Sequence, residues 1–503
     1  MGIADSKTVP KREARLDAIE TFGGPLRDLV KHPGGGCLIN CRRSFSQTCN
    51  CQMGLSLSML NTMPDIVIIK HGPVGCGNSS QNDKNFTSGL RARDIKVRPL
   101  IWASTNLNEN DIINGGEKKL REAIISLDRL HRPAAIVVLT TCAPSIIGDD
   151  ADDVVEKARA ETSAKVLLVR CEGFRTKISA MGYDDVYHAI LKGLDLEDQR
   201  EEDLLARRVD NEEFLWRRDY EAQRTINVFN AFSVGRPDEL EIERLLNALD
   251  LKVNFYPNFA HPDAFRRITR AALNVGLCPT HDDYFLQYLE ERYGMPYFIG
   301  EMPLGLSNTA VWLQELGRRL GREKEAALLV AQEEELLQKG LDLYRPLLRG
   351  KKVFITGGEI RVVVTAMLLE ELGCELVGLR GHHYDLFGPH VYGKLLENHA
   401  DLEVNIATTQ TFELANLLKR AKPDLVFAHG GSGVVAAKMG VPVVPVFSQG
   451  QYYFGYSGAF SIARRAAKAL QNPAYFRNLQ ANTRLPYKKE WFGRSPFDYI
   501  RKE

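Results

Sequence analysis

The sequence predicts an α/β fold made of doubly wound parallel sheets, and three observations support this prediction. From about residue 60 onward, short runs of β-branched residues alternate with longer amphipathic stretches. Such alternation is typical of strand–helix–strand units whose strands pair in parallel. Several apolar runs pass directly into glycine-containing turns, as at the carboxyl ends of such strands. With 503 residues, the chain is long enough for two or three domains of this class.

The expected strands are short and rich in valine and isoleucine. They cover residues 65–70, 134–141, 164–170, 225–232, 251–257, 351–358, 402–409, 423–429 and 441–447. The stretches between them repeat their apolar residues at helical spacing. These expected helices cover residues 149–161, 237–250, 263–274, 282–294, 361–373 and 411–422.

Two segments mark the expected domain boundaries. Residues 195–225 are densely charged, and residues 318–350 are rich in glutamate, leucine, lysine and arginine, which predicts one long helix. We therefore expect three Rossmann-like doubly wound α/β domains. They cover residues 1–220, which include an N-terminal segment without clear periodicity, then 221–345 and 346–503.

Composition argues against several classes of function. The net charge is +1, so no basic surplus points to nucleic acid, and no polybasic tail points to a membrane surface. The longest apolar runs are far too short to span a bilayer. The first residues lack the apolar centre of a secretion signal, so we expect a cytoplasmic protein with reduced cysteines.

Cys51, Cys76 and Cys142 lie where chemistry is expected in a parallel sheet. Cys76 follows the apolar run 65–70 in the turn HGPVGC, and Cys142 follows the run 134–141. Carboxyl ends of parallel strands form the usual ligand-binding edge of such a sheet, and thiolates there suit iron–sulfur centres. A zinc site is not favoured, because Cys37/Cys41 and Cys49/Cys51 lack the usual finger spacing and a matching second pair.

Several motifs together resemble the nitrogenase molybdenum–iron protein family. They are HGPVGCG, the segment from TTC to IGDD, CEGFR, and a cysteine followed by a stretch ending in EERYGMP. They occur in that family's order and at similar intervals, over roughly residues 45–460. The resemblance implies three domains around a central cluster site.

The resemblance also implies ligands for a P-cluster, an eight-iron iron–sulfur relay shared with a partner subunit. Cys76 and Cys142 match two of its thiolates. Cys51, which begins CQMG, is favoured as the third, with Cys49 as the alternative. The roles of Cys37 and Cys41 stay open.

Cys278 matches the thiolate that holds one end of the family's active-site cluster, which makes this an α-type subunit. Gly357, Gly358 and Arg361 resemble the cationic wall of that cofactor pocket. Positive charge and backbone N–H groups are what an anionic cluster needs nearby.

Departures from the family are equally informative. Nitrogenase has a histidine ligand in the segment that here reads VPVVPVFSQGQYYFGYSGAF, which contains none. Ser179 and Tyr183 stand where nitrogenase has glutamine and histidine, and Lys84 stands in place of an arginine. We therefore expect a large iron–sulfur cluster without molybdenum.

Three histidines are candidate proton donors near this pocket. His382 and His383 follow a predicted strand-rich stretch, and His429 lies at the end of the strand 423–429. Histidine titrates near neutral pH, and Tyr183 is a further candidate donor.

The pattern is most similar to methylthio-alkane reductases, which implies reductive cleavage of a carbon–sulfur bond in a small organosulfur substrate. The implied partners are a homologous β-type subunit, in an α2β2 heterotetramer, and an ATP-dependent iron–sulfur reductase homodimer. A cofactor-assembly scaffold, a true nitrogenase α-subunit and a metal-free α/β enzyme remain alternatives.

Overall fold

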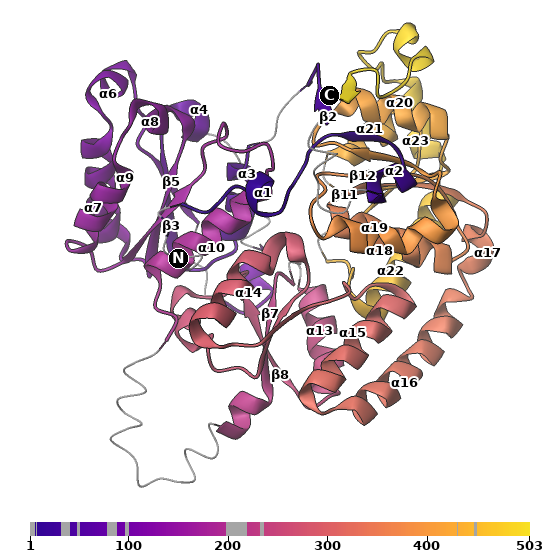
Figure 1. Ribbon diagram of the computed structural model, residues 1–503, viewed down its shortest axis with the longest axis horizontal. Coiled ribbons are helices and arrows are strands. Elements are labelled where there is room, and N and C mark those ends of the chain that lie inside the picture. The colour runs from indigo at the N-terminus through magenta and orange to yellow at the C-terminus, as the bar shows by residue number, and fades with distance from the viewer. Residues whose placement is uncertain are drawn as a thin grey trace. The chain divides into compact units, whose positions relative to one another are not determined.

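The chain forms two compact units (Figure 1). Our computed structural model describes residues 6, 8–31, 41–47, 51–77, 88–95, 100–197, 219–231, 236–429, 431–446 and 450–502. Unit 1 comprises Met1–Lys11, Cys51–Glu239 and Asp250–Gly300. Unit 2 comprises Arg12–Asn50, Leu240–Leu249 and Glu301–Glu503.

Unit 1 contains two parallel sheets among its described residues. The first has the order β4 (Ile101–Ser104), β3 (Ile66–His71), β5 (Ala135–Thr140) and β6 (Lys165–Arg170). The second has the order β10 (Tyr297–Ile299), β9 (Leu273–Gly276), β7 (Thr225–Phe229) and β8 (Lys252–Tyr256). Every residue of β3 and β5 is buried, as expected for strands covered on both faces.

Helices cover both faces of the first sheet. The helices of unit 1 include α3 (Met53–Leu60), α4 (Val74–Gly77), α6 (Glu109–Asn114), α7 (Glu117–His131), α8 (Cys142–Ile147), α9 (Ala151–Arg159), α10 (Met181–Gly193), η1 (Pro262–Arg267) and α14 (Pro279–Tyr293). Ile66 and Ile68 belong to the apolar core shared with α3, α10 and α14. Val67 and Ile69 belong to a second core with α7 and α9. Because successive strand residues point to opposite faces, the continuous apolar run of β3 supplies both cores.

Unit 2 contains one larger sheet whose interior strands are parallel. Its order is β1 (Phe22–Pro25), β13 (Glu403–Ile406), β12 (Glu375–Gly381), β11 (Lys352–Gly357), β14 (Leu425–Ala428) and β15 (Val443–Pro445). β1 joins the edge antiparallel to β13. A small antiparallel pair joins β2 (Cys41–Arg43) to β16 (Ile500–Lys502).

The helices of unit 2 pack around this sheet and against one another. They include α1 (Arg12–Arg15), α2 (Leu26–Val30), α15 (Gly305–Leu320), α16 (Glu323–Leu341), α17 (Arg345–Leu348), α18 (Glu359–Glu371), α19 (Gly388–His399), α20 (Thr411–Ala421), α21 (Ser432–Lys438), α22 (Gly455–Gln471), α23 (Ala474–Ala481) and η2 (Lys489–Gly493). α13 (Pro237–Asn247) runs across the boundary between the two units in the sequence. Among the described residues, no helix combines the length and the apolar composition needed to span a membrane.

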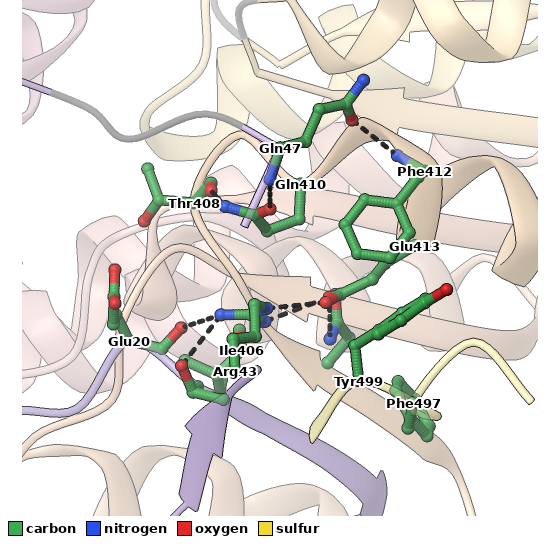
Figure 2. Close-up of polar contacts among 12 residues, drawn as sticks. Glu20, Arg43, Gln47, Ile406, Thr408, Gln410, Phe412, Glu413, Phe497 and Tyr499 are labelled. Carbon is green, nitrogen blue, oxygen red and sulfur yellow. Dashed lines mark hydrogen bonds and ion pairs between the residues drawn. The ribbon is translucent and has the colours of Figure 1, made fainter. Parts of the chain in front are cut away.

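A buried ion pair fixes the segment around β2 to unit 2 (Figure 2). The guanidinium of Arg43 donates to Glu413 at 2.6 and 3.0 Å, and also to the carbonyl oxygens of Ile406 and Glu20. Both charged side chains are almost fully buried. The two-point geometry satisfies both charges, so losing either partner would leave the other charge buried and uncompensated.

The predicted fold class is confirmed, since parallel sheets covered by helices occur throughout. All nine predicted strands lie on observed strands. Each of the three expected domains supplies the parallel strands of one of the three larger sheets, whereas the boundaries between the domains stay a prediction.

Two local predictions are wrong. The expected helix 263–274 is the short η1 followed by β9, because hydrogen bonding of Leu273–Gly276 between β7 and β10 outweighs the helical pattern. The expected single helix 318–350 is broken, because α15 ends at Gly321 in a left-handed conformation with φ 65°. A tight hairpin with α16 follows.

A close contact between α3 and α10 gives a test of this packing. A methyl group on Gly182 would lie 2.4 Å from the carbonyl oxygen of Gln52, so Gly182→Ala should destabilise the protein by about 1–3 kcal/mol. Gly54→Ala is the control, because its methyl group meets nothing within 4 Å and alanine favours the helix. Thermal unfolding should show a lower midpoint for Gly182→Ala alone; equal midpoints would contradict the packing.

Candidate metal centre

Strands β3, β5 and β6 of the first sheet end side by side, and each is followed by a segment that contains a cysteine. β5 pairs in parallel with β3 and β6, and the register places Thr140 beside both His71 and Arg170. Cys76 follows β3 within α4, and Cys142 is the first residue of α8 after β5. Cys171 and Gly173 follow β6. One sheet edge therefore carries two of the predicted thiol ligands.

Gly173 lies between the thiols of Cys51 and Cys142. Its N–H donates to Cys142 Sγ at 3.2 Å. A methyl group on Gly173 would lie 3.2 Å from Cys51 Sγ and 3.8 Å from Cys142 Sγ. The glycine of CEGFR thus leaves room around both sulfur atoms and supplies a donor of the kind that stabilises a thiolate.

The side chain of Gln52 holds the Cys51 segment against the end of β6. Its Nε2 donates to the carbonyl oxygens of Arg170 and Glu172, each at 3.2 Å. Glu172 is itself fixed by Thr140, whose hydroxyl donates to Glu172 Oε1 at 2.6 Å. Gln52 was not among the predicted site residues, although its place in CQMG directly after Cys51 was a usable signal.

The thiols of unit 1 differ in their exposure to solvent. Cys51 is exposed, and Cys76 and Cys142 are partly exposed. Cys171 is buried with its sulfur 3.4 Å from Ser56 Oγ, and burial raises its pKa well above the ordinary value. Cys171 therefore packs as a neutral thiol, whereas the other three can reach a ligand at the surface of unit 1.

The donor set fits a cluster of several metal ions better than a single ion. Within the described residues, the sulfur atoms of Cys51, Cys76 and Cys142 do not all lie within 4.8 Å of one another. Thiolates are the usual ligands of iron–sulfur clusters, and the space kept open by Gly173 lies beside two of them. Cys49 and Cys37 lie outside the described residues, and Cys41 begins β2 in unit 2.

Cys278 lies at the amino end of α14, directly after β9. It is buried, and its carbonyl oxygen accepts the N–H groups of His281 and Asp282 at 3.0 and 3.2 Å. The positive end of a helix favours a thiolate, and Pro279 at the first helical position suits this geometry. Cys278 can therefore bind a metal in a largely dry environment.

Tyr183 lies beside the first turn of α14. Its ring is 4.4 Å from the ring of His281, and it comes from the start of α10. The carbonyl oxygen of Ser179 accepts the N–H of Gly182 at 3.0 Å, just before that helix. Unit 1 thus brings Tyr183 close to the helix that begins at Cys278. Lys84 lies outside the described residues.

A buried polar network lies in the same first turn of α14, and none of its residues was among the predicted site residues. Asp282 Oδ1 accepts hydrogen bonds from the Tyr187 hydroxyl at 3.2 Å and from Asn230. Burial raises the pKa of Asp282 to about 7, against the lowering effect of these donors. Its only sequence signal was the pair of aspartates that follows Cys278.

The predicted pocket residues of unit 2 gather at the carboxyl edge of its sheet. Gly357 ends β11 and Gly358 precedes α18, while His429 follows the neighbouring parallel strand β14. A methyl group on Gly357 would lie 3.3 Å from His429 Cβ, and the His382 ring lies 6.0 Å from the His429 ring. Gly358 has no such steric constraint, because a methyl group there would meet nothing within 4 Å.

Arg361 supplies a buried positive charge to this group. Its guanidinium lies over the rings of Tyr453 and Phe454, at 5.2 and 5.4 Å. Burial, together with Arg361, lowers the pKa of His429 to about 4. Burial, with His429 and Arg380, also lowers the pKa of His382 well below its usual value. Both imidazoles are therefore neutral at pH 7 and can give or accept hydrogen bonds without carrying charge.

His383 interacts with different groups from those around His382 and His429. Its Nε2 faces the carboxylates of Asp385 and Glu359, at 3.5 and 3.8 Å. The two adjacent histidines therefore belong to different surroundings.

Comparison with known proteins identifies relatives for most of the chain. Residues 51–471 match the family described as nitrogenase component 1 type oxidoreductase. The nitrogenase molybdenum–iron protein alpha chain of Methanococcus maripaludis is 25% identical over 491 residues, covering 93% of this chain and 95% of the relative. The nitrogenase iron-molybdenum cofactor biosynthesis protein NifE of the same organism is 26% identical over 442 residues, covering 85% and 83%.

The solved structures support the fold. A chain from the structure titled "Nitrogenase Cp1 at pH 5" superposes with a TM-score of 0.68 at 19% identity, covering 92% of this chain and 100% of that one. A second, titled "Nitrogenase Cp1 at pH 6.5", also gives a TM-score of 0.68, at 16% identity, covering 86% and 94%.

Gly173 provides a test of the thiol site. Gly173→Ala should reduce the iron bound after anaerobic reconstitution, because its methyl group lies in the space beside Cys51 and Cys142. Gly393→Ala is the control, since a methyl group there meets nothing within 4 Å. Iron analysis and absorption spectra should separate the two variants. Parent-like iron content and spectra in Gly173→Ala would exclude a cluster at this place.

His429 gives a pH-dependent test. Its pKa is about 4 in the folded protein and about 6.5 when unfolded, so below pH 6.5 the unfolded state takes up a proton that the folded state does not. Stability should therefore fall by up to about 3 kcal/mol between pH 6.5 and pH 4.

His429→Gln should lack the contribution of this imidazole to the pH dependence. Urea unfolding between pH 6.5 and pH 4 should therefore show a smaller loss of unfolding free energy in the variant than in the parent. His390→Gln, which removes an exposed imidazole, is the control. The same pH dependence in His429→Gln and in the parent would contradict the assignment.

Proposed function

This chain belongs to the nitrogenase component 1 type oxidoreductase family, and we propose that it is the cluster-bearing catalytic subunit of a nitrogenase-like reductase. One observation carries the proposal. The buried thiol of Cys278 lies at the positive end of α14, in the same unit as the thiol-bearing sheet edge. A dry, single-thiol anchor and a set of more exposed thiols suit two clusters with different tasks.

The first task is electron relay. In this proposal, Cys51, Cys76 and Cys142 hold a P-cluster-type eight-iron cluster together with a homologous β-type subunit. Support comes from their exposure, which would let a second chain complete the ligand set, and from the space beside Gly173. The complete assembly would be an α2β2 heterotetramer, supplied with electrons by an ATP-dependent iron–sulfur reductase homodimer.

The second task is substrate reduction at the cluster held by Cys278. Ser179 and Tyr183 are proposed as polar residues near the substrate, because Tyr183 lies beside the first turn of α14. Gly357, Gly358 and Arg361 are proposed as the cationic part of the cofactor pocket, with His382 and His429 as neutral hydrogen-bonding groups. Lys84 keeps its proposed role from the sequence alone.

We propose that this cluster lacks molybdenum. The sequence from Val441 to Phe460 contains no histidine, so the second metal ligand of nitrogenase has no counterpart there. An iron-only cluster held through Cys278 suits thiolate ligation, whereas an apical molybdenum would need a further nitrogen or oxygen donor.

The proposed reaction is cleavage of a carbon–sulfur bond in a small methylthio-alkane. The substrate CH3–S–R takes up two electrons and two protons, its S–R bond breaks, and methanethiol and R–H leave, where R–H is methane when the substrate is dimethyl sulfide. The cluster would supply the electrons, while the protein orients the substrate and delivers protons through Tyr183 and neighbouring groups. Reduced thiols are required throughout, which suits a cytoplasmic location.

A cofactor-assembly scaffold is the second candidate. The observation in its favour is that the NifE relative is as similar to this chain as the nitrogenase alpha chain is. A scaffold would transfer its cluster to an apo-enzyme and release no methanethiol.

Turnover by the purified complex distinguishes these candidates. With ATP, the reductase partner and dimethyl sulfide or 2-(methylthio)ethanol, the parent complex should release methanethiol and contain iron with negligible molybdenum. Cys278→Ser should lower the rate by at least about 100-fold, because even indirect changes at metal sites cost about 10–100-fold.

Cys374→Ser is the matched control. Cys374 packs near the carbonyl oxygen of Leu348, at 3.5 Å, and serine keeps this contact. Its rate should stay close to that of the parent. Methanethiol release by Cys278→Ser at the parent rate would exclude the catalytic role, and cluster transfer without turnover would identify a scaffold.

A further inference from the structure

Three buried side chains of unit 2 form a group with the composition of a metal site. Glu359 is the first residue of α18, and His383 and Asp385 lie in the loop after β12. Their potential ligand atoms all lie within 4.8 Å of one another, and within the described residues no other set of three His, Cys, Asp or Glu side chains meets this limit. All three residues are at least 95% buried.

The distances suit metal ligands better than hydrogen bonds. His383 Nε2 lies 3.5 Å from Asp385 Oδ2 and 3.8 Å from Glu359 Oε2. Hydrogen bonds between such atoms are about 2.7–3.2 Å long. Ligand atoms about 2.1 Å from a tetrahedral ion lie about 3.4 Å apart. The distances between these side-chain atoms are therefore close to those between the ligands of one bound ion.

The atoms of this group that face one another lack other hydrogen-bond partners. These are both carboxylate oxygens of Glu359, Nε2 of His383 and Oδ2 of Asp385. A buried polar group without a partner costs about 1–3 kcal/mol, and a charged one costs more. The other oxygen of Asp385 accepts the N–H of Phe387 at 3.0 Å, which fixes the direction of the carboxylate. Polar atoms without hydrogen-bond partners, from two segments of the chain, thus converge on one point.

Charge in this region is only partly balanced. Arg12 is fully buried, and its positive charge favours the ionised form of both Glu359 and Asp385. Burial and the neighbouring Asp385 nevertheless raise the pKa of Glu359 well above its ordinary value. For Asp385, the raising effect of burial is outweighed by His383, Arg12 and the N–H of Phe387. A divalent cation would balance the negative charge of the two carboxylates that the guanidinium of Arg12 balances only in part.

Gly388 leaves room for the carboxylate of Glu359. A methyl group on this residue would lie 2.6 Å from Glu359 Oε1 and 2.3 Å from the ring of Tyr384. Only glycine therefore allows α19 to begin this close to the carboxylate.

We propose that Glu359, His383 and Asp385 bind one divalent transition-metal ion, of the zinc(II) or iron(II) class, at a site separate from the thiol-bound clusters. One imidazole and two carboxylates form a donor set that such ions accept. The ion would join the start of α18 to the loop after β12. His383 is then a structural ligand rather than a proton donor, and the adjacent His382 is positioned through it.

Zinc binding by the full-length chain tests the proposal. The parent protein is stripped of metal with a chelator and then given Zn²⁺. It should bind one equivalent of Zn²⁺ at this site. X-ray absorption at the zinc edge should show nitrogen and oxygen neighbours at about 2.0–2.1 Å, without sulfur, for this ion. Cys278→Ser should keep this N/O-bound zinc, which separates the site from the thiols and from the proposed function.

Asp385→Asn and His383→Gln should bind the N/O-bound zinc at least about tenfold more weakly. His390→Gln, an exposed histidine on α19, should bind it as the parent does. Because the buried variants could also fail to fold, an anomalous-scattering map of the zinc-soaked parent provides an independent measurement. A peak among Glu359, His383 and Asp385 supports the proposal; no peak there, or unchanged zinc in both folded variants, overturns it.

Discussion

The parallel pairing of β3, β5 and β6 is the constraint on which the thiol site depends. Because the strands run in the same direction and in fixed register, the loops that follow His71, Thr140 and Arg170 must leave from one edge. Buried strand side chains on both faces secure that register, since a shift by one residue would exchange the two cores. The placement of Cys76 and Cys142 at one sheet edge thus follows from apolar residues in the strands before them.

Positioning within that edge depends on glycine and glutamine rather than on cysteine. Gly182 lets α10 approach the backbone at Gln52, and the Gln52 amide then holds the Cys51 segment against β6. Gly173 keeps the space beside Cys51 and Cys142 clear and donates to one sulfur. Close packing around a site leaves little freedom for its ligands, which preorganises them before any metal binds.

The sequence allowed prediction of features that repeat or that carry distinctive chemistry. Continuous apolar runs indicated β3 and β5, and the thiols after them indicated which sheet edge is the candidate metal site. It could not reveal η1 and β9 within 263–274, because sheet hydrogen bonds from distant strands decide that segment. Nor could it show that Cys171 is buried while Cys51 is exposed, since burial depends on tertiary packing of α3 and α10.

The adjacent histidines His382 and His383 show most clearly why residue type alone does not define function. His382 lies in the bend that follows β12 and His383 comes directly after it, yet the two side chains contact different groups. His382 lies near His429 at the sheet edge, where burial and positive charge keep it neutral. His383 faces two buried carboxylates, at distances typical of shared metal ligation. If a cation holds His383, the direction of His382 is fixed as well, and the proposed metal site would control the geometry of the proposed cofactor pocket.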